Sequence, residues 1–124
     1  MQTQSQQQPK YDLENRTFDF AQNVRTLLSS IRSTRITPED KKQLVRSSGS
    51  VAANYLEANE AISKNDFIMR IKICRKEAKE SHMWLSLIRG GIEPNLQIRF
   101  DGLIDEAMQL VKIFNAIAYK VKAN

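Results

Sequence analysis

Apolar residues return at intervals of three and four positions along four stretches of the chain, the spacing that gathers them on one face of an α-helix. The pattern predicts helices at about residues 12–32, 38–62, 64–89 and 96–121. Because the connections between them are short, neighbouring helices are expected to run antiparallel. The expected fold is all-α, an antiparallel up-and-down four-helix bundle formed by a single domain of residues 11–124.

Local signals support the helix ends. Start signals stand at three places: Asp12 or Asn15 for the first helix, Thr37 with Pro38 for the second, and Ser63 with Asp66 in capping-box spacing for the third. Gly90 and Gly91, followed by Pro94, are typical of a helix stop. These signals predict that the third helix ends at a glycine cap.

Each helix has a face that suits the core of a bundle. The expected core residues are Phe20, Val24, Leu27, Leu28 and Ile31 with Phe18 and Ala21 beside them; Leu44, Ser48, Val51, Tyr55, Ala58 and Ile62; Phe67, Ile71, Cys74, Ala78, Ser81, Leu85 and Ile88; and Phe100, Leu103, Ile104, Ala107, Val111, Phe114, Ile117, Ala118 and Val121. Ser47, Ser48 and Ser50 are interpreted as small residues at tight helix packing.

The third helix carries two further stripes, far round from its core face. One is apolar and contains Met69, Ile73, Trp84 and Leu87. The other is basic, since Lys72, Arg75, Lys76 and Lys79 fall at i, i+3, i+4 and i+7. One core cannot cover both apolar faces of the same helix. The pattern therefore predicts a surface role for this element.

Composition narrows the class of protein. The chain has 124 residues, of which 41% are hydrophobic and 27% charged, as in a globular domain. Its net charge of +5 points to acidic partners such as nucleic acid, and residues 64–89 hold seven Lys or Arg against three acids. The Gln-rich residues 1–10 have little to bury and are expected to form a disordered tail.

The single cysteine, Cys74, excludes an intramolecular disulfide and fits a reducing compartment. It lies on the predicted core face, where we interpret it as a small hydrophobic residue. The chain shows neither a signal-peptide pattern nor an apolar run long enough to span a bilayer. A cytoplasmic location is the expectation.

Enzymatic patterns are sparse. A carboxylate metal site in a bundle needs Glu-x-x-His pairs, and the only histidine, His82, has no glutamate three positions before it, so no metal or cofactor is expected. Arg75 and His82 have six residues between them, which resembles the short Arg-x4-6-His signature of HEPN ribonucleases. Histidine chemistry near neutral pH would suit such cleavage. Because the motif is short, a non-catalytic protein is the favoured expectation.

The basic strip, defined as Lys72, Arg75, Lys76 and Lys79, has two interpretations. It is either a solvated helix face or a surface that binds nucleic-acid phosphates by charge, with little sequence preference. No aromatic residue interrupts the strip, so base stacking is not indicated.

The apolar stripe, defined as Met69, Ile73, Trp84 and Leu87, is favoured as a contact between subunits over a contact within the chain, because exposed tryptophan commonly anchors interfaces. Glu77 and Glu80 flank it and are expected to pair with basic groups across that contact. On the second helix, Arg46 and Glu57 belong to a stripe of small and charged residues that would let another helix approach, and they complete the expected interface.

Several of these stretches resemble a known family, the four-helix-bundle proteins encoded within intervening sequences of bacterial 23S ribosomal RNA genes. The resemblance covers about residues 11–121. It is carried by Asp12-Leu13-Glu14 with Arg16-Thr17-Phe18, by Arg46-Ser47-Ser48 through Ser50-Val51-Ala52-Ala53-Asn54-Tyr55-Leu56-Glu57-Ala58, by Asp66-Phe67, and by Cys74-Arg75-Lys76-Glu77-Ala78-Lys79-Glu80-Ser81 with Trp84-Leu85. Ala58 replaces a common glycine, and His82-Met83 replace an arginine and an aromatic residue, which weakens any family role for position 82.

The resemblance implies a ring-like homopentamer without accepted enzymatic activity. The accessory variability proteins of diversity-generating retroelements are similar, and they bind nucleic acid and a reverse transcriptase through a basic surface. The expected function is thus a non-catalytic, oligomeric nucleic-acid-binding protein. The alternatives are a scaffold for a protein partner, such as a nucleic-acid enzyme, and a ribonuclease.

Overall fold

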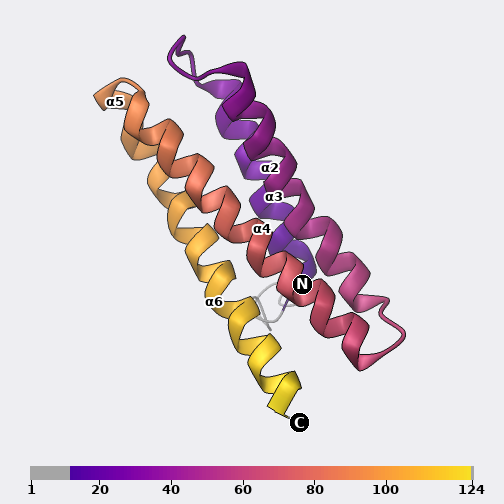
Figure 1. The fold of residues 1–124 in the computed structure, drawn as a ribbon. Coiled ribbons are helices and arrows are strands. Elements are labelled where there is room, and N and C mark those ends of the chain that lie inside the picture. Colours follow the sequence, from indigo (N-terminus) through magenta and orange to yellow (C-terminus); the bar gives the residue numbers. More distant parts are fainter. Residues whose placement is uncertain (1–11, 124) are drawn as a thin grey trace, which may run out of the picture.

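A computed structural model describes residues 12–123, and the predicted tail of residues 1–10 lies outside them. Four long helices run alternately up and down, as Figure 1 shows. They are α2 (Leu13–Ser30), α3 (Pro38–Asn59), α4 (Lys64–Gly91) and α6 (Asp101–Ala123), and the short α5 (Pro94–Gln97) and η2 (Ile98–Phe100) connect the last two. No strand occurs within this range. The predicted all-α four-helix bundle is confirmed.

Side-chain caps explain where the helices begin. Asp12 accepts a hydrogen bond from the backbone N–H of Asn15 (3.2 Å), which settles which of the two residues caps α2. The hydroxyl of Thr37 accepts from the N–H of Asp40 (3.1 Å), and Ser63 accepts from that of Asp66 (3.0 Å). Each bond satisfies a donor in the first turn that has no partner within its helix.

The end of α4 differs from the prediction. Gly90 and Gly91 are both helical, and neither has a positive φ, so no left-handed glycine cap exists there. The helix ends because Ile92 is extended (φ −95°, ψ 176°), with its side chain in the core. Pro94 then starts the single turn of α5. The continuous last helix consequently begins at Asp101, later than the predicted residue 96.

The hydrophobic core follows the predicted faces with few exceptions. Its fully buried members include Phe20, Leu44, Ile71, Leu85, Leu110 and Phe114. Leu110 was not predicted, whereas Phe18 is 59% exposed. Ile62 is 95% exposed because α3 ends at Asn59, so its assignment to the core stripe is wrong. Ser47 and Ser48 are completely buried, as expected for close helix packing.

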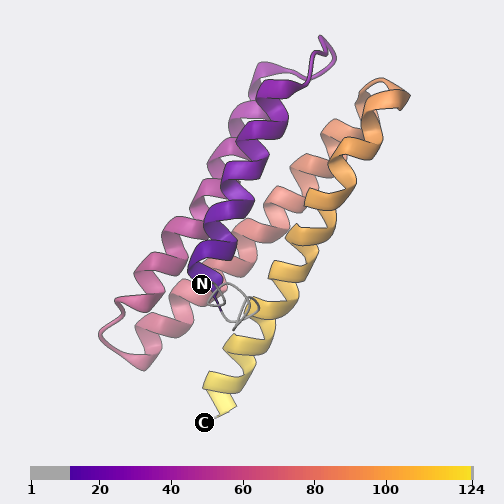
Figure 2. The same ribbon diagram turned by 180° about the vertical axis from the view of Figure 1, so that it is seen from behind.

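The helices are unequally packed. The most extensive contacts join α3 to α4 and α4 to α6, followed by α2 to α3, whereas α2 and α6 touch little. Figures 1 and 2 show α4 lying lengthwise beside both neighbours. On the sparsely packed side, Arg16 donates two hydrogen bonds to Glu106 (2.7 and 2.9 Å). Within the described residues, no helix is both long and apolar enough to cross a membrane.

Candidate nucleic-acid and self-association surface

Contacts on both flanks of α4 fix which part of this helix faces outward. Toward α3, the hydroxyls of Ser47 and Ser81 are 2.8 Å apart, and Cys74 Sγ donates to the carbonyl of Val51 (3.6 Å). Toward α6, Arg75 Nη1 donates to Asn115 Oδ1 (2.8 Å). Among residues 12–123, the side of α4 away from the core therefore lies uncovered between two packed flanks.

The basic strip lies on this open side. Lys72, Lys76 and Lys79 are exposed, and Arg75 is half-buried beside α6. Among residues 12–123, none of these four cations is within 4.0 Å of a carboxylate oxygen. Their positive charge is therefore not neutralised by a close carboxylate within the described part of the chain.

A shallow hollow of about 730 Å³ joins the two predicted surfaces. All four residues of the basic strip line it, together with two residues of the apolar stripe; the complete lining is Asn65, Ile68, Met69, Lys72, Ile73, Arg75, Lys76 and Lys79. Cations and apolar side chains thus border the same depression on the first half of α4. Because part of its wall is apolar, the hollow can contact hydrophobic groups of a ligand as well as anionic ones.

The apolar stripe divides into exposed and half-buried members. Met69 is 60% exposed and Leu87 56% exposed, whereas Ile73 and Trp84 are half-buried. Trp84 packs against the core from outside. Within the apolar stripe, Met69 and Leu87 are therefore the two side chains most accessible to another molecule.

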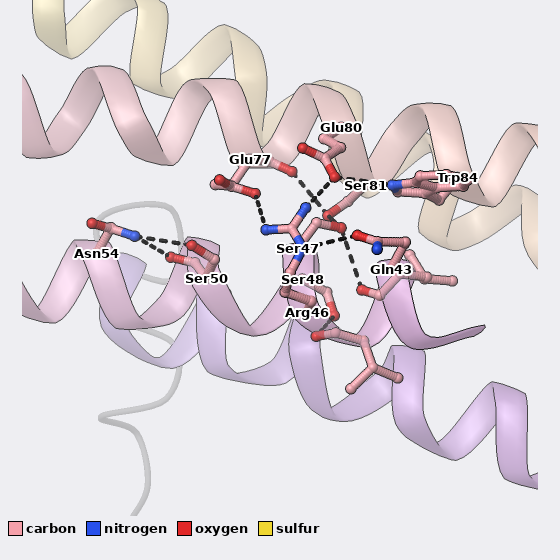
Figure 3. Close-up of polar contacts among 12 residues, drawn as sticks. Gln43, Arg46, Ser47, Ser48, Ser50, Asn54, Glu77, Glu80, Ser81 and Trp84 are labelled. Carbon is pink, nitrogen blue, oxygen red and sulfur yellow. Dashed lines mark hydrogen bonds and ion pairs between the residues drawn. The ribbon is translucent and has the colours of Figure 1, made fainter. Parts of the chain in front are cut away.

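A polar network connects α3 to α4 beside that stripe, as Figure 3 shows. Arg46 of α3 forms ion pairs with Glu77 (3.2 Å) and with Glu80, and Glu80 also accepts a hydrogen bond from the indole N–H of Trp84 (3.0 Å). Glu77 is only 8% exposed. These two carboxylates, expected to pair across a subunit contact, already have a cationic partner within the chain.

Two pKa values reflect this network. The hydrogen bond from Trp84 is the main cause that lowers the pKa of Glu80, and Arg46 lowers it further. The hydrogen bond to Glu80 raises the pKa of Arg46. Both shifts favour the charged forms that hold α3 and α4 together. Of the predicted interface residues on α3, Glu57 is exposed and Arg46 serves mainly this link.

The possible ribonuclease pair lies on the flank toward α6. Arg75 and His82 are seven residues apart, which separates their backbones by about 10 Å along the helix. The guanidinium of Arg75 is engaged with Asn115, and His82 is half-buried.

Some contacts of this surface had no signal in the sequence. Asn115 holds Arg75, and Arg46 holds Glu77, between residues that are 40 and 31 positions apart in the sequence. Helical periodicity gives the facing direction of each helix but not its register against a neighbour. The partners therefore emerge only from the assembled bundle.

The family model described as 23S rRNA-intervening sequence protein matches residues 10–116. The chain belongs to this family. The matched range includes every residue of the basic strip and of the apolar stripe.

A solved structure supports the same assignment. It is the crystal structure of a protein with unknown function from the S23 ribosomal protein family of Bacteroides thetaiotaomicron VPI-5482, which is 28% identical to this chain with a TM-score of 0.70. The similarity covers 85% of this chain and 96% of that one. No curated protein matches. The chain thus shares its helical fold with this S23-family protein.

Proposed function

We propose that this protein is a non-catalytic, homo-oligomeric module that binds nucleic acid through the basic strip. The proposal rests on the four cations of that strip, none of which lies within 4.0 Å of a carboxylate oxygen among residues 12–123. Glu77 and Glu80 lie on the same helix but are held by Arg46 on the opposite flank. The strip therefore presents a local excess of positive charge that suits anionic phosphates.

Phosphates bound to such a strip would displace condensed counterions, and binding would depend steeply on salt. Four phosphate contacts give a slope of log K against log salt of about −3.6 on duplex DNA and about −2.8 on a single strand. Raising the salt concentration fourfold would then weaken binding by roughly fifty- to 150-fold. Contacts of this kind read charge and spacing rather than base sequence.

Self-association is the second part of the proposal. Met69 and Leu87 present apolar surface beside the strip, and their burial between subunits would place several strips on one particle. A homopentamer is the assembly that the family resemblance implies. Each added strip raises the effective affinity for a long nucleic acid, since later contacts become intramolecular. The working location is the cytoplasm, in keeping with the free thiol of Cys74.

A protein partner is the alternative, and the hollow favours it. Its lining pairs cations with Met69 and Ile73, which suits an acidic segment that also carries apolar side chains. In this case the protein would act as a scaffold or adaptor, for example for an enzyme that works on nucleic acid. The scaffold predicts no appreciable affinity for bare RNA or DNA at physiological salt.

The test is a gel-retardation time course with structured RNA and duplex DNA at two salt concentrations, with each sample also run on a denaturing gel. On the native gel we expect a retarded band that becomes weaker at high salt. On the denaturing gel the probe should keep its full length. An unshifted, intact probe would contradict nucleic-acid binding and favour the adaptor. A shortened probe would contradict the non-catalytic role and favour the ribonuclease that uses Arg75 and His82. In that case His82→Ala should abolish cleavage.

A further inference from the structure

The second half of α6 is basic and contains no acidic residue. Beyond Ala107 the helix carries Lys112, Lys120 and Lys122 without a single Asp or Glu. All three lysines are exposed. Tyr119 lies among them and is 79% exposed. This stretch is therefore a second source of positive charge, and it holds an aromatic ring in solvent.

Two contacts fix the level of α6 against α4. Arg75 donates to Asn115 (2.8 Å), and Arg89 donates to Asp101 (2.6 Å). The arginines are fourteen residues apart along α4, and their partners are fourteen apart in the opposite direction along α6. The two helices are thus in even antiparallel register over this length.

This register brings the basic part of α6 level with the strip. Lys79 lies at the level of Val111, next to Lys112, and Lys72 lies at the level of Ala118, next to Tyr119. One turn earlier on α4, Ile68 is level with Lys122. The shared stretch is about 15 Å long at 1.5 Å per residue.

The same residues of α6 also share one side of their helix. Lys112, Asn115, Tyr119 and Lys122 follow each other at intervals of three, four and three, the spacing of neighbours on a helix surface. Because Asn115 binds Arg75, this side borders the flank of α4 on which the strip begins. The strip and this side of α6 therefore form one surface across the α4–α6 seam.

We infer that this combined surface is a track for single-stranded nucleic acid. The strip, Lys112 and Lys122 hold successive phosphates, and Tyr119 stacks on an unpaired base. A duplex keeps its bases paired and stacked internally, so only a single strand can use the ring. The inference rests on the proposed function and names its substrate class. It also revises the expectation that no base stacks here, which considered the residues of α4 alone.

The experiment is a fluorescence-anisotropy titration of the whole protein with three probes: a labelled single-stranded oligonucleotide, the same strand in a duplex, and an abasic strand of equal length. The variants are Tyr119→Ala, Tyr119→Phe and Lys112→Glu/Lys122→Glu. Phe18→Ala, which removes an exposed aromatic ring from α2, controls for Tyr119→Ala. Arg32→Glu/Lys42→Glu changes net charge equally at two exposed positions elsewhere.

We expect the single strand to bind more tightly than the duplex. Tyr119→Ala should weaken single-strand binding at least about fivefold, because stacking of a base on an aromatic side chain contributes that much or more. It should change binding of the abasic strand less than twofold, and Tyr119→Phe should bind like the wild type. The double lysine variant should weaken binding of both strands more than its charge-matched control does.

Tighter binding of the duplex, or an unchanged affinity of Tyr119→Ala for the single strand, would overturn the track while leaving the strip as a phosphate site. Equal effects of the double lysine variant and its control would show that Lys112 and Lys122 do not contribute to binding. If the wild-type protein bound none of the probes, the track and the proposed function would both fall.

Discussion

The buried thiol of Cys74 couples the stability of the bundle to alkaline pH. Its side chain is completely inaccessible, and burial raises its pKa from an ordinary 9.0 to about 12. Above pH 9 the unfolded chain loses the thiol proton while the folded chain keeps it. The free energy of unfolding should therefore fall as pH rises from about 9 to 12, by about 1.4 kcal/mol per pH unit.

Urea unfolding of the wild type and of Cys74→Ala at pH 8, 10 and 11 measures this contribution. The alanine variant will be less stable at pH 8 because it leaves a small cavity. The gap between the two proteins should narrow as pH rises, since only the wild type has the thiol. A gap that stays constant with pH would contradict the assignment.

At the scale of elements, the link between α3 and α4 depends on Arg46. Without it the nearly buried carboxylate of Glu77 would lose its cation, so Arg46→Met should lower the free energy of unfolding by about 1–3 kcal/mol. Glu77→Gln in the same chain should restore part of that loss. The coupling energy from this double-mutant cycle should exceed about 0.5 kcal/mol.

The pair of Arg89 and Asp101 is the matched control, because it also joins two helices but is more exposed to solvent. Its cycle should give a smaller coupling energy, as surface ion pairs do. Equal coupling energies in the two cycles would mean that the burial of Glu77 adds nothing to the α3–α4 link.

The end of α4 gives a second prediction at this scale. Gly90 is helical, and a Cβ atom placed on it would meet no atom within 4 Å. Gly90→Ala should therefore stabilise the protein by about 0.5 kcal/mol or more, measured by urea unfolding. Gly49→Ala should gain less, because its Cβ would lie 3.1 Å from Arg25 Nη2. Destabilisation by Gly90→Ala would indicate the left-handed cap that the sequence suggested.

These elements show what the sequence could and could not predict. The periodicity of apolar residues is enough to identify four helices and most of their buried faces, and the caps at Thr37 and Ser63 were readable from local residue types. Ile62 was misassigned because periodicity continues past the point where α3 stops. The strip was visible because it lies within one helix. Its neighbour Tyr119 was not, because the register of α6 against α4 depends on contacts between distant residues.

For the molecule as a whole, we expect self-association into an oligomer. Light scattering after size-exclusion chromatography should give a mass that is a multiple of 14.3 kDa. Met69→Asp/Leu87→Asp should shift it toward the monomer, because burying a charge in the subunit contact is costly. The control is Ile62→Asp/Ile98→Asp, at two positions that are more exposed and lie off the stripe. A wild-type monomer, or equal dissociation of the control, would contradict a contact through the apolar stripe.

The proposed function depends on the strip on α4 binding nucleic-acid phosphates. Its most direct test is the affinity of Lys72→Glu/Lys79→Glu for labelled RNA and duplex DNA over a range of salt, beside the charge-matched Arg32→Glu/Lys42→Glu. We expect the strip variant to lose at least about tenfold in affinity, with a salt slope shallower by about two units because two phosphate contacts are gone. The control should keep the wild-type slope. An unchanged affinity and slope in the strip variant would show that nucleic acid does not bind there.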